Sequence, residues 1–555
     1  MPLTNESPPS IRSSTPGTDQ KPIADSTLRS AALDANPRPA PVLLADMPPL
    51  RRVVTFLSLA IAVFLASFEV TVVSTAIPKI ALEFHALSDA TWITTTYMLT
   101  TTALQPLYGK LSDVFGRVPT LLFAILVFMA GSTACGWAPS MGVLVFGRAL
   151  QGIGGAGLLS LVFIIISDLT TAKQRPAYLG VNNLMWTISS VIGPVLGGLL
   201  SDRASWRWVF WINLPIASVV FAVVLITLRL PVPNSSVSDK LQRVDFLGSL
   251  VLVGGVVMLL LGLTWGGKTY PWTSARVICL LASGVLALGV FILVEWRIAA
   301  EPLVPLHLLR SRNVCVAVAN QFFTWMGMYA VMFYVPIWYA VVKNSSSLSL
   351  GLHMLPYLAG ISIASIGAGF VVSKTGRYRL IIAVGSLIHA TGCALFVLLD
   401  EHTSMARQIG FLLFVGLGLG FIIQTLIIAA QAAVSVKDMA ATTSLVMFMR
   451  VLGSSIGIAV FQSMLQNAVI PELTTLAGQY PAHAQVFAAS LNDQSVIYSA
   501  NLPDNVQSQL VHFYVVALQR VFIAATAFTG AAFVAVLGIR HIPLDRGGGQ
   551  NAKSN

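Results

Sequence analysis

Long apolar runs separated by short polar segments follow one another along most of the chain. Each run holds about twenty residues with few or no ionisable side chains, enough for a helix to cross a hydrocarbon layer of ~30 Å. Fourteen such runs lie at 53–76, 91–108, 118–136, 141–166, 183–201, 208–228, 246–265, 276–296, 314–340, 350–372, 380–399, 408–431, 442–465 and 511–539. The pattern therefore predicts an all-α integral membrane protein with fourteen transmembrane helices.

Lys and Arg are distributed unevenly between these runs. With the start of the chain placed inside, most of them fall in the first tail, in alternate turns and after residue 539, whereas the segment 466–510 has neither. Because basic residues stay on the cytoplasmic side, we expect cytoplasmic tails at 1–52 and 540–555, a cytoplasmic connection at 230–243 and an outer loop at 466–510. The tail 1–52 is rich in Pro, Ser and Ala and should be disordered. The net charge of +11 then reflects orientation and requires no nucleic-acid partner.

The composition excludes most other classes of protein. Hydrophobic residues make up 55% of the chain and charged residues 10%, and the mean hydropathy is +0.78, so a soluble globular protein is excluded. The sequence has no Walker lysine motif, no H-E-x-x-H and no G-x-S-x-G after a strand. Its four cysteines have no ligand spacing. We expect no enzymatic activity, no cofactor and no metal, and any work must draw on an ion gradient or on the substrate's own gradient.

A repeated motif divides the runs into two halves. The stretch Gly109-Lys-Leu-Ser-Asp-Val-Phe-Gly-Arg117 follows the second run, and Gly369, Gly376 and Arg377 repeat its glycines and arginine after the tenth. The fifth and thirteenth runs also match, since Met185 recurs as Met449. Parallel repeats around a midplane cavity are a transporter architecture. We predict two pseudo-symmetric six-helix bundles, at 53–229 and at 314–539 with its outer loop, joined by 230–313, which holds cytoplasmic connections and two inserted helices.

We interpret the repeated motif as a conformational hinge in a tight turn between two helices. Gly109 and Gly116 lack a Cβ atom and allow close approach, while Asp113 and Arg117 can pair with each other or cap helix ends. In the second copy Ser373 replaces Asp113. An ordinary cytoplasmic connection anchored by its charges is the alternative.

Ionisable residues inside membrane helices are costly and therefore indicate function. Glu69 lies within the first run, where burial favours the neutral carboxyl and suits a reversible proton carrier; a Glu that only locks helices is the alternative. Arg148 lies in the fourth run beside a glycine-rich segment and is a candidate for binding an anion or a carboxylate. Arg450 lies in the thirteenth run, as a structural anchor or a substrate contact, and Arg520 should reach an interface.

Two further sets of residues could shape a transport path. The fifth run contains Gly193, Pro194, Gly197 and Gly198, and proline with three glycines indicates a shaped hinge. The aromatic ninth run and the amides of the twelfth indicate a cavity for a large amphiphilic guest. The candidate cavity residues are Phe322, Trp325, Tyr329, Gln424, Gln431 and Arg450.

These motifs resemble those of the major facilitator superfamily, in particular its fourteen-span drug:proton antiporter branch of fungal efflux pumps. Gly109–Arg117 is similar to the hinge motif after span 2. The stretch that begins at Arg148 is similar to the span 4 motif, which is implicated in proton coupling. Gly193–Gly198 is similar to the antiporter motif of span 5. One difference is that members of the branch usually have Asp where this chain has Glu69.

The resemblance implies alternating access, export of an amphiphilic small organic molecule such as a secondary metabolite, toxin or drug, and import of protons. On that basis we expect Glu69 and Arg148 to couple the proton, with Glu69 protonated when the cavity opens outward and Arg148 approaching it when the cavity opens inward. A siderophore or basic-amino-acid transporter and a transport-dead receptor remain as alternatives. We expect a monomer in the lipid bilayer of the plasma membrane, or of the vacuole, with Asn344 in an outer turn as a glycosylation acceptor.

Overall fold

A computed structural model describes residues 44–544 apart from 87–88, 172, 232–235, 237–244, 268, 298–302, 304, 346, 492–493, 495 and 500–501. The predicted disordered tail up to residue 43, most of the 230–243 connection and the last residues from 545 lie outside the described residues. Within the described part the chain is helical and has no strand beyond one isolated bridge between Gly266 and Tyr270.

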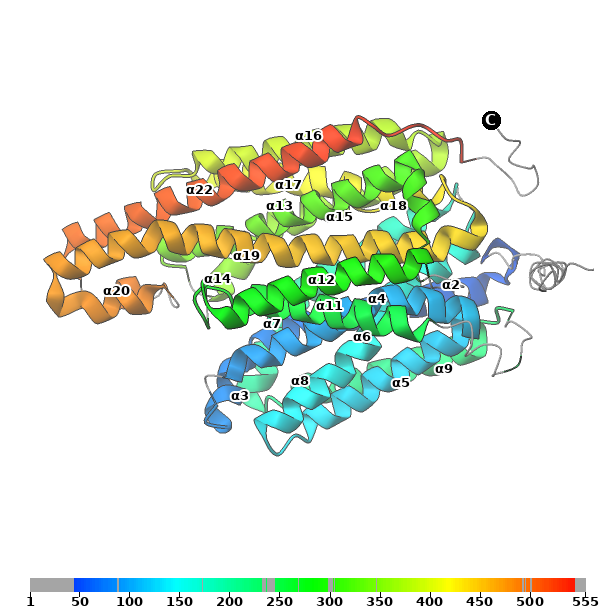
Figure 1. Ribbon diagram of the computed structural model, residues 1–555, viewed down its shortest axis with the longest axis horizontal. Helices are drawn as coiled ribbons and strands as arrows, with labels where there is room; N and C mark the ends of the chain where they lie inside the picture. The colour runs from blue at the N-terminus through cyan, green and yellow to red at the C-terminus, as the bar shows by residue number, and fades with distance from the viewer. Residues whose placement is uncertain are drawn as a thin grey trace, which may run out of the picture. The chain divides into compact units, whose positions relative to one another are not determined.

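Helices follow one another along the described chain (Figure 1). The α-helices are α2 (Pro49–Ser74), α3 (Ile77–Glu83), α4 (Ala90–Phe115), α5 (Arg117–Gly136), α6 (Met141–Leu169), α7 (Arg175–Arg203), α8 (Trp208–Trp211), α9 (Asn213–Thr227), α11 (Phe246–Trp265), α12 (Ala275–Arg297), α13 (Arg312–Lys343), α14 (Ser347–His353), α15 (Leu355–Thr375), α16 (Tyr378–Leu395), α17 (Met405–Ile423), α18 (Thr425–Gln431), α19 (Met439–Gln479), α20 (Ala484–Ser490), α21 (Val496–Ser499) and α22 (Asp504–Val536). Short 3-10 segments are η1 (Leu44–Asp46), η3 (Leu306–Arg310), η4 (Phe396–Leu398), η5 (Val436–Asp438) and η6 (Pro481–His483).

Thirteen helical stretches of the described chain are long and apolar enough to cross a membrane. This confirms an all-helical membrane fold, but with thirteen such stretches instead of the predicted fourteen. The second predicted span, α4, has 26 residues yet falls outside this set, because threonines crowd its first half and lower its hydropathy. The predicted outer loop 466–510 is also partly helical, since α19 continues to Gln479 and α20 and α21 follow.

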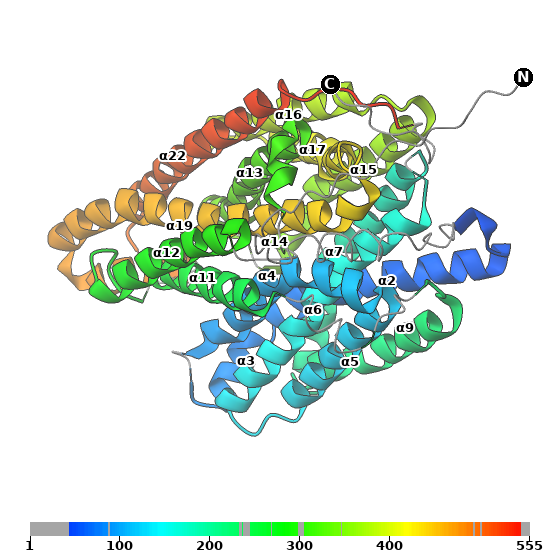
Figure 2. The same cartoon turned by 45° about the vertical axis from the view of Figure 1, so that its right-hand side comes forward.

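Two groups of helices pack against each other. One contains α2, α4, α5, α6, α7 and α9, and the other contains α13, α15, α16, α17, α18, α19 and α22. The groups meet where α7 packs on α15 and where α4 packs on α19, and α11 lies against both α4 and α19 (Figure 2). We call the end of this assembly with the α4–α5 and α15–α16 connections the turn end, and the end with α20 the loop end (Figure 1).

The predicted tight turn at 109–117 is much shorter than expected. Helix α4 continues through Gly109 and Asp113 to Phe115, so only Gly116 separates it from α5. Gly116 has a φ of 98°, and Gly376 between α15 and α16 has a φ of 68°. Both backbone conformations favour glycine, which explains why the repeat keeps this residue. The expectation that the whole stretch 109–117 forms the tight turn was wrong, because most of it continues helix α4.

Candidate functional site

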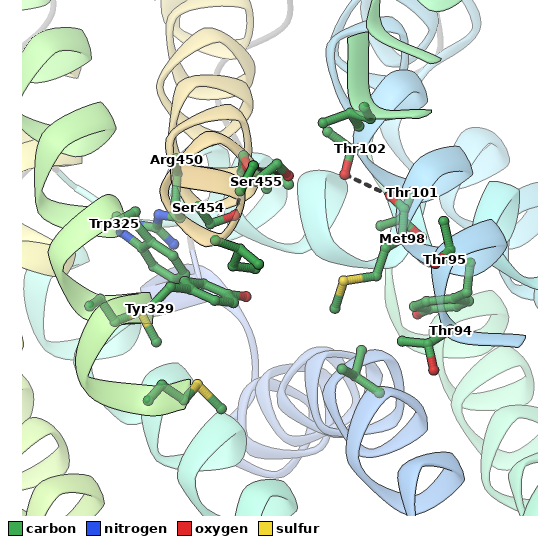
Figure 3. A pocket seen from close by; sticks show the side chains of 18 of the residues that line it. Thr94, Thr95, Met98, Thr101, Thr102, Trp325, Tyr329, Arg450, Ser454 and Ser455 are labelled. Carbon is green, nitrogen blue, oxygen red and sulfur yellow. Dashed lines mark hydrogen bonds between the residues drawn. The ribbon is translucent and has the colours of Figure 1, made fainter. Parts of the chain in front are cut away.

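A cavity of about 720 Å³ lies among the membrane helices. Helix α4 forms one wall, and α13 and α19 form the facing wall (Figure 3). The lining also includes Gly266 of the α11 end and Leu491 and Gln494 of the loop end. The cavity therefore extends from the middle of the helices toward the loop end, and its size is typical of sites for drug-sized ligands.

Half of the predicted cavity residues line this space. Trp325, Tyr329 and Arg450 do so, and Figure 3 shows them together on α13 and α19. Phe322 does not: it packs in an apolar cluster with α4 and α11, where its backbone closely approaches Gly453. Gln424 is buried at the junction of α17 and α18. Helical periodicity could not separate these positions, because α13 is buried on several sides.

The polar wall of the cavity was missed from the sequence. It consists of the α4 side chains Thr94, Thr95, Thr101, Thr102 and Gln105. These hydroxyl groups give a guest hydrogen-bonding partners opposite the aromatic wall. The same threonines remove α4 from the set of apolar helices, so the low hydropathy of an otherwise uncharged run was the signal of a cavity-lining helix.

Glu69 and Arg148 form a fully buried ion pair. Arg148 donates to the Glu69 carboxylate, to Gln151 Oε1 at 2.7 Å and to the carbonyl oxygen of Ile93 at 2.8 Å. Asn213 of α9 donates to the second carboxylate oxygen. The side chains of Glu69 and Arg148 are 0% and 1% exposed, so the two charges neutralise each other away from solvent.

Tyr97 separates this pair from the cavity. Its ring lines the cavity and also lies 4.5 Å below the guanidinium carbon of Arg148. Its hydroxyl donates to the carbonyl oxygen of Ala66 on α2, at 3.3 Å. Gly155 makes room for it, since a Cβ atom there would lie 2.5 Å from the tyrosine oxygen. A guest in the cavity would therefore contact Tyr97 and not Glu69 directly.

Contacts between the two helix groups close the turn end. Arg175 of α7 donates to Gln431 Oε1 of α18 at 2.9 Å, and Gln431 Nε2 donates to Ser167 Oγ of α6 at 3.0 Å. Gln431 was predicted as a cavity residue, but it is not among the residues that line this cavity, and its amide group is buried in the network. Arg175 was not singled out because an arginine in a short polar turn reads as an ordinary anchor.

The first glycine of each repeated motif lies at a crossing between the two groups. A Cβ atom at Gly109 of α4 would lie 2.3 Å from Ser444 Oγ on α19. At Gly369 of α15 it would lie 2.5 Å from the carbonyl oxygen of Pro176 on α7. Both positions thus require the small residue for close approach of opposite halves at the turn end.

Charged residues of the two motif copies differ in their surroundings. Arg117 forms ion pairs with Asp113 at 2.7 Å and with Asp168 of α6 at 2.8 Å. Asp168 was not predicted, since it follows an apolar run, and a charge at the end of a membrane helix is common and does not by itself indicate function. Arg377 of the second copy is exposed and has no ion pair among the described residues. The first copy alone links three charges across α4, α5 and α6.

The glycines of α7 pack against the helix that carries Glu69. A Cβ atom at Gly193 would lie 2.0 Å from Thr71 Oγ1, and one at Gly197 would lie 2.3 Å from Thr75 Oγ1. Gly198 faces open space and has no such role. Pro194 lies within a helix that continues on both sides of it. Gly193 and Gly197 therefore hold α7 against α2.

Asn344, the predicted glycosylation acceptor, ends α13 in a left-handed conformation with a φ of 49°. Its side chain is exposed. Ser346, which completes the acceptor motif, lies outside the described residues. Modification at Asn344 stays a prediction.

Similar proteins are transporters. The model of the Major Facilitator Superfamily matches residues 59–458. Efflux pump dotC of Dothistroma septosporum is 34% identical over 87% of this chain and 83% of its own length. Efflux pump FUS6 of Gibberella fujikuroi is 30% identical over 93% of this chain and 95% of its own. The solved structure of the proton:xylose symporter XylE, bound to 6-bromo-6-deoxy-D-glucose, aligns with a TM-score of 0.53 at 13% identity over 86% of this chain and 94% of that one, a likeness in fold alone.

Proposed function

Because the chain belongs to the major facilitator superfamily, we propose that it is a proton-coupled secondary transporter that exports an amphiphilic small organic molecule by alternating access. Its similarity to efflux pumps over most of both chains supports the direction of transport. The apolar cavity, with threonines on one wall and aromatic rings on the other, supports an amphiphilic cargo.

The observation that carries the proposal is the buried pair of Glu69 and Arg148 beside the cavity. A carboxylate and a guanidinium inside a helix bundle are costly to bury, so their presence there indicates a function. Protonation of Glu69 would remove the charge that holds Arg148, so proton binding would change the contacts among α2, α4, α6 and α9. This gives a proton a way to alter the conformational equilibrium.

The closed turn end supports a different order of events from the one expected from the sequence. Arg148 already contacts Glu69 while the Arg175–Gln431 bond holds the turn end shut. Approach of Arg148 is thus not restricted to a state that is open at the turn end. We infer that a proton arriving from the loop end breaks the pair, and that its release restores the pair.

Tyr97 is the proposed link between cargo and proton. It contacts the cavity on one side and the Arg148 guanidinium on the other. A bound guest that displaces the ring would expose Arg148 or shift it relative to Glu69. Cargo and proton would then influence each other through one side chain, without sharing a binding site.

We further propose a topology with fourteen spans, α4 included, and with the turn end in the cytoplasm. Residues 53–229 and 314–539 would form the two moving bundles, and 230–313 would add two helices beside them. Helix α4 fits this role because four of its threonines, Thr94, Thr95, Thr101 and Thr102, line the cavity. The plasma membrane is the proposed location.

The test uses yeast cells that lack their own efflux pumps and express the wild type or Glu69→Gln at equal levels. Two fluorescent amphiphiles serve as probes, the anionic 1-pyrenebutyrate and the neutral 1-pyrenebutyramide. Wild-type cells should retain less of at least one probe than Glu69→Gln cells, and a protonophore should abolish the difference. Higher retention in wild-type cells than in Glu69→Gln cells would instead identify an importer. If the two kinds of cell retain each probe equally, the export of amphiphiles is contradicted.

A further inference from the structure

Arg450 is the one charged side chain among the described residues that line the cavity. It lies on α19, is 8% exposed, and its side chain extends to the Trp325 ring of α13 (Figure 3). Its guanidinium carbon lies 4.6 Å from the centre of the Trp325 ring. The ring holds the group by one face and leaves its edges, where the N–H donors lie, available.

The described hydrogen bonds do not satisfy this guanidinium. It has five N–H donors, of which one, on Nη2, reaches the carbonyl oxygen of Ile423 at a long 3.3 Å. Its Nε is buried without a partner, and no carboxylate in the described chain forms an ion pair with it. A purely structural anchor would be expected to use more of its donors, so that alternative is disfavoured.

Two other buried arginines of the described chain have stronger hydrogen-bond partners than Arg450. Arg148 has the Glu69 carboxylate, an amide oxygen and a carbonyl oxygen. The Nε of Arg175 is buried without a partner, as that of Arg450 is, but its two Nη groups reach the Gln431 amide oxygen at 2.9 Å and the Ser167 carbonyl oxygen at 2.7 Å. Arg450 differs from both in facing a cavity with most of its donors unused.

A buried cation without a counter-charge is costly, and the cost falls when an anion binds. We propose that the cargo is an organic anion, with its carboxylate or similarly acidic oxygen on Arg450 and its apolar body between the α13 aromatic side chains and the α4 threonines. A guanidinium presents parallel donors that match two oxygens of such a group. This inference rests on the proposed export function and adds the charge of its cargo.

The experiment measures binding of 1-pyrenebutyrate and 1-pyrenebutyramide to the purified full chain in detergent, by energy transfer from tryptophan to pyrene. The two probes share their apolar body and differ in charge. The wild type should bind the acid about tenfold or more tightly than the amide. Arg450→Gln should bind both about equally, with the affinity for the amide unchanged, and Arg450→Lys should keep part of the preference for the acid.

Arg520→Gln is the matched control, since it makes the same change on the exposed face of α22 and should keep the full preference. Equal affinity of the wild type for acid and amide would overturn the proposal, as would failure to bind the acid. Displacement of the acid by phosphatidylglycerol at equal concentration would also overturn it, by identifying the site as one for lipid. If Arg450→Gln does not fold, the wild-type ratio and Arg450→Lys still decide.

Transport separates this inference from the proposed function. Preference for the acid that depends on Arg450, without any proton-dependent export, would leave the inference intact and contradict proton-coupled export. Proton-dependent export of both probes, bound with equal affinity, would contradict this inference and leave proton-coupled export intact.

Discussion

Replacing Gln431 by Leu should release the turn end. Gln431 of α18 accepts a hydrogen bond from Arg175 and donates one to Ser167, and both partners belong to the opposite helix group. Leu has a similar volume and cannot make either bond. In a state open at the turn end, water would satisfy Arg175 and Ser167, so the substitution weakens the closed state alone.

The magnitude follows from these two bonds. A hydrogen bond to a charged group contributes about 1.5–3 kcal/mol and a neutral one about 0.5–1.5 kcal/mol. Their loss should cost the closed state about 2–4.5 kcal/mol, which is roughly a 30- to 2,000-fold change in the equilibrium between closed and open turn ends. Even the lower value would convert a mostly closed population into a mixed one.

Spin labels can measure this shift. Thr171 and Val436 are exposed turn-end positions on opposite helix groups, and labels there report the separation of the groups by pulsed electron resonance. Gln431→Leu should move the population toward longer distances. Thr443→Val is the control, because the bond from Gln431 to Thr443 lies within one group and its loss should leave the distances unchanged. An equal shift in both variants, or none in Gln431→Leu, would refute the reasoning.

Three further predictions concern other parts of the mechanism. Gly369→Ala should also favour opening of the turn end, by about 1–3 kcal/mol, because its Cβ would meet a backbone oxygen. Gly367→Ala is the control, since its Cβ would meet open space and should leave the equilibrium unchanged. The same spin-label distances check both variants. Glu69→Gln should bind cargo with wild-type affinity yet lose concentrative export, and wild-type export driven by a pH gradient would remove Glu69 from the mechanism. Arg117→Ala should slow export without changing cargo affinity, since Arg117 links helices at the turn end far from the cavity lining; a large loss of affinity in detergent would contradict this.

The sequence was sufficient for features that contrast with their surroundings. Glu69 and Arg148 stand out because a charge in an apolar run has few explanations in a membrane. Gly116 and Gly376 stand out because both copies of the motif keep a glycine where the backbone turns with positive φ. In each case one residue type and its local context were enough.

Features that depend on which helix faces which were not predictable. Gln431 and Gln105 are both amides in apolar runs, yet one closes the turn end and the other lines the cavity. The difference arises from the packing of distant segments, which periodicity on a single helix does not contain. The α4 threonines were overlooked for a related reason, since each is nearly neutral in hydropathy and only their common orientation toward the cavity gives them meaning.

The repeat explains the shape of the cavity but not its charges. Trp186 on α7 and Arg450 on α19 follow the matched residues Met185 and Met449, and both line the cavity, so corresponding faces of the repeated helices point inward. The charges break this symmetry. The acid–base pair lies in the first half, outside the cavity, and the unpaired cation lies in the second half, inside it. On the proposals above, a cargo anion and a proton therefore bind to different halves of the chain, so they need not compete for one carboxylate. Coupling must then arise from the equilibrium between open and closed states, which both ligands alter by contacts on opposite sides of the same cavity.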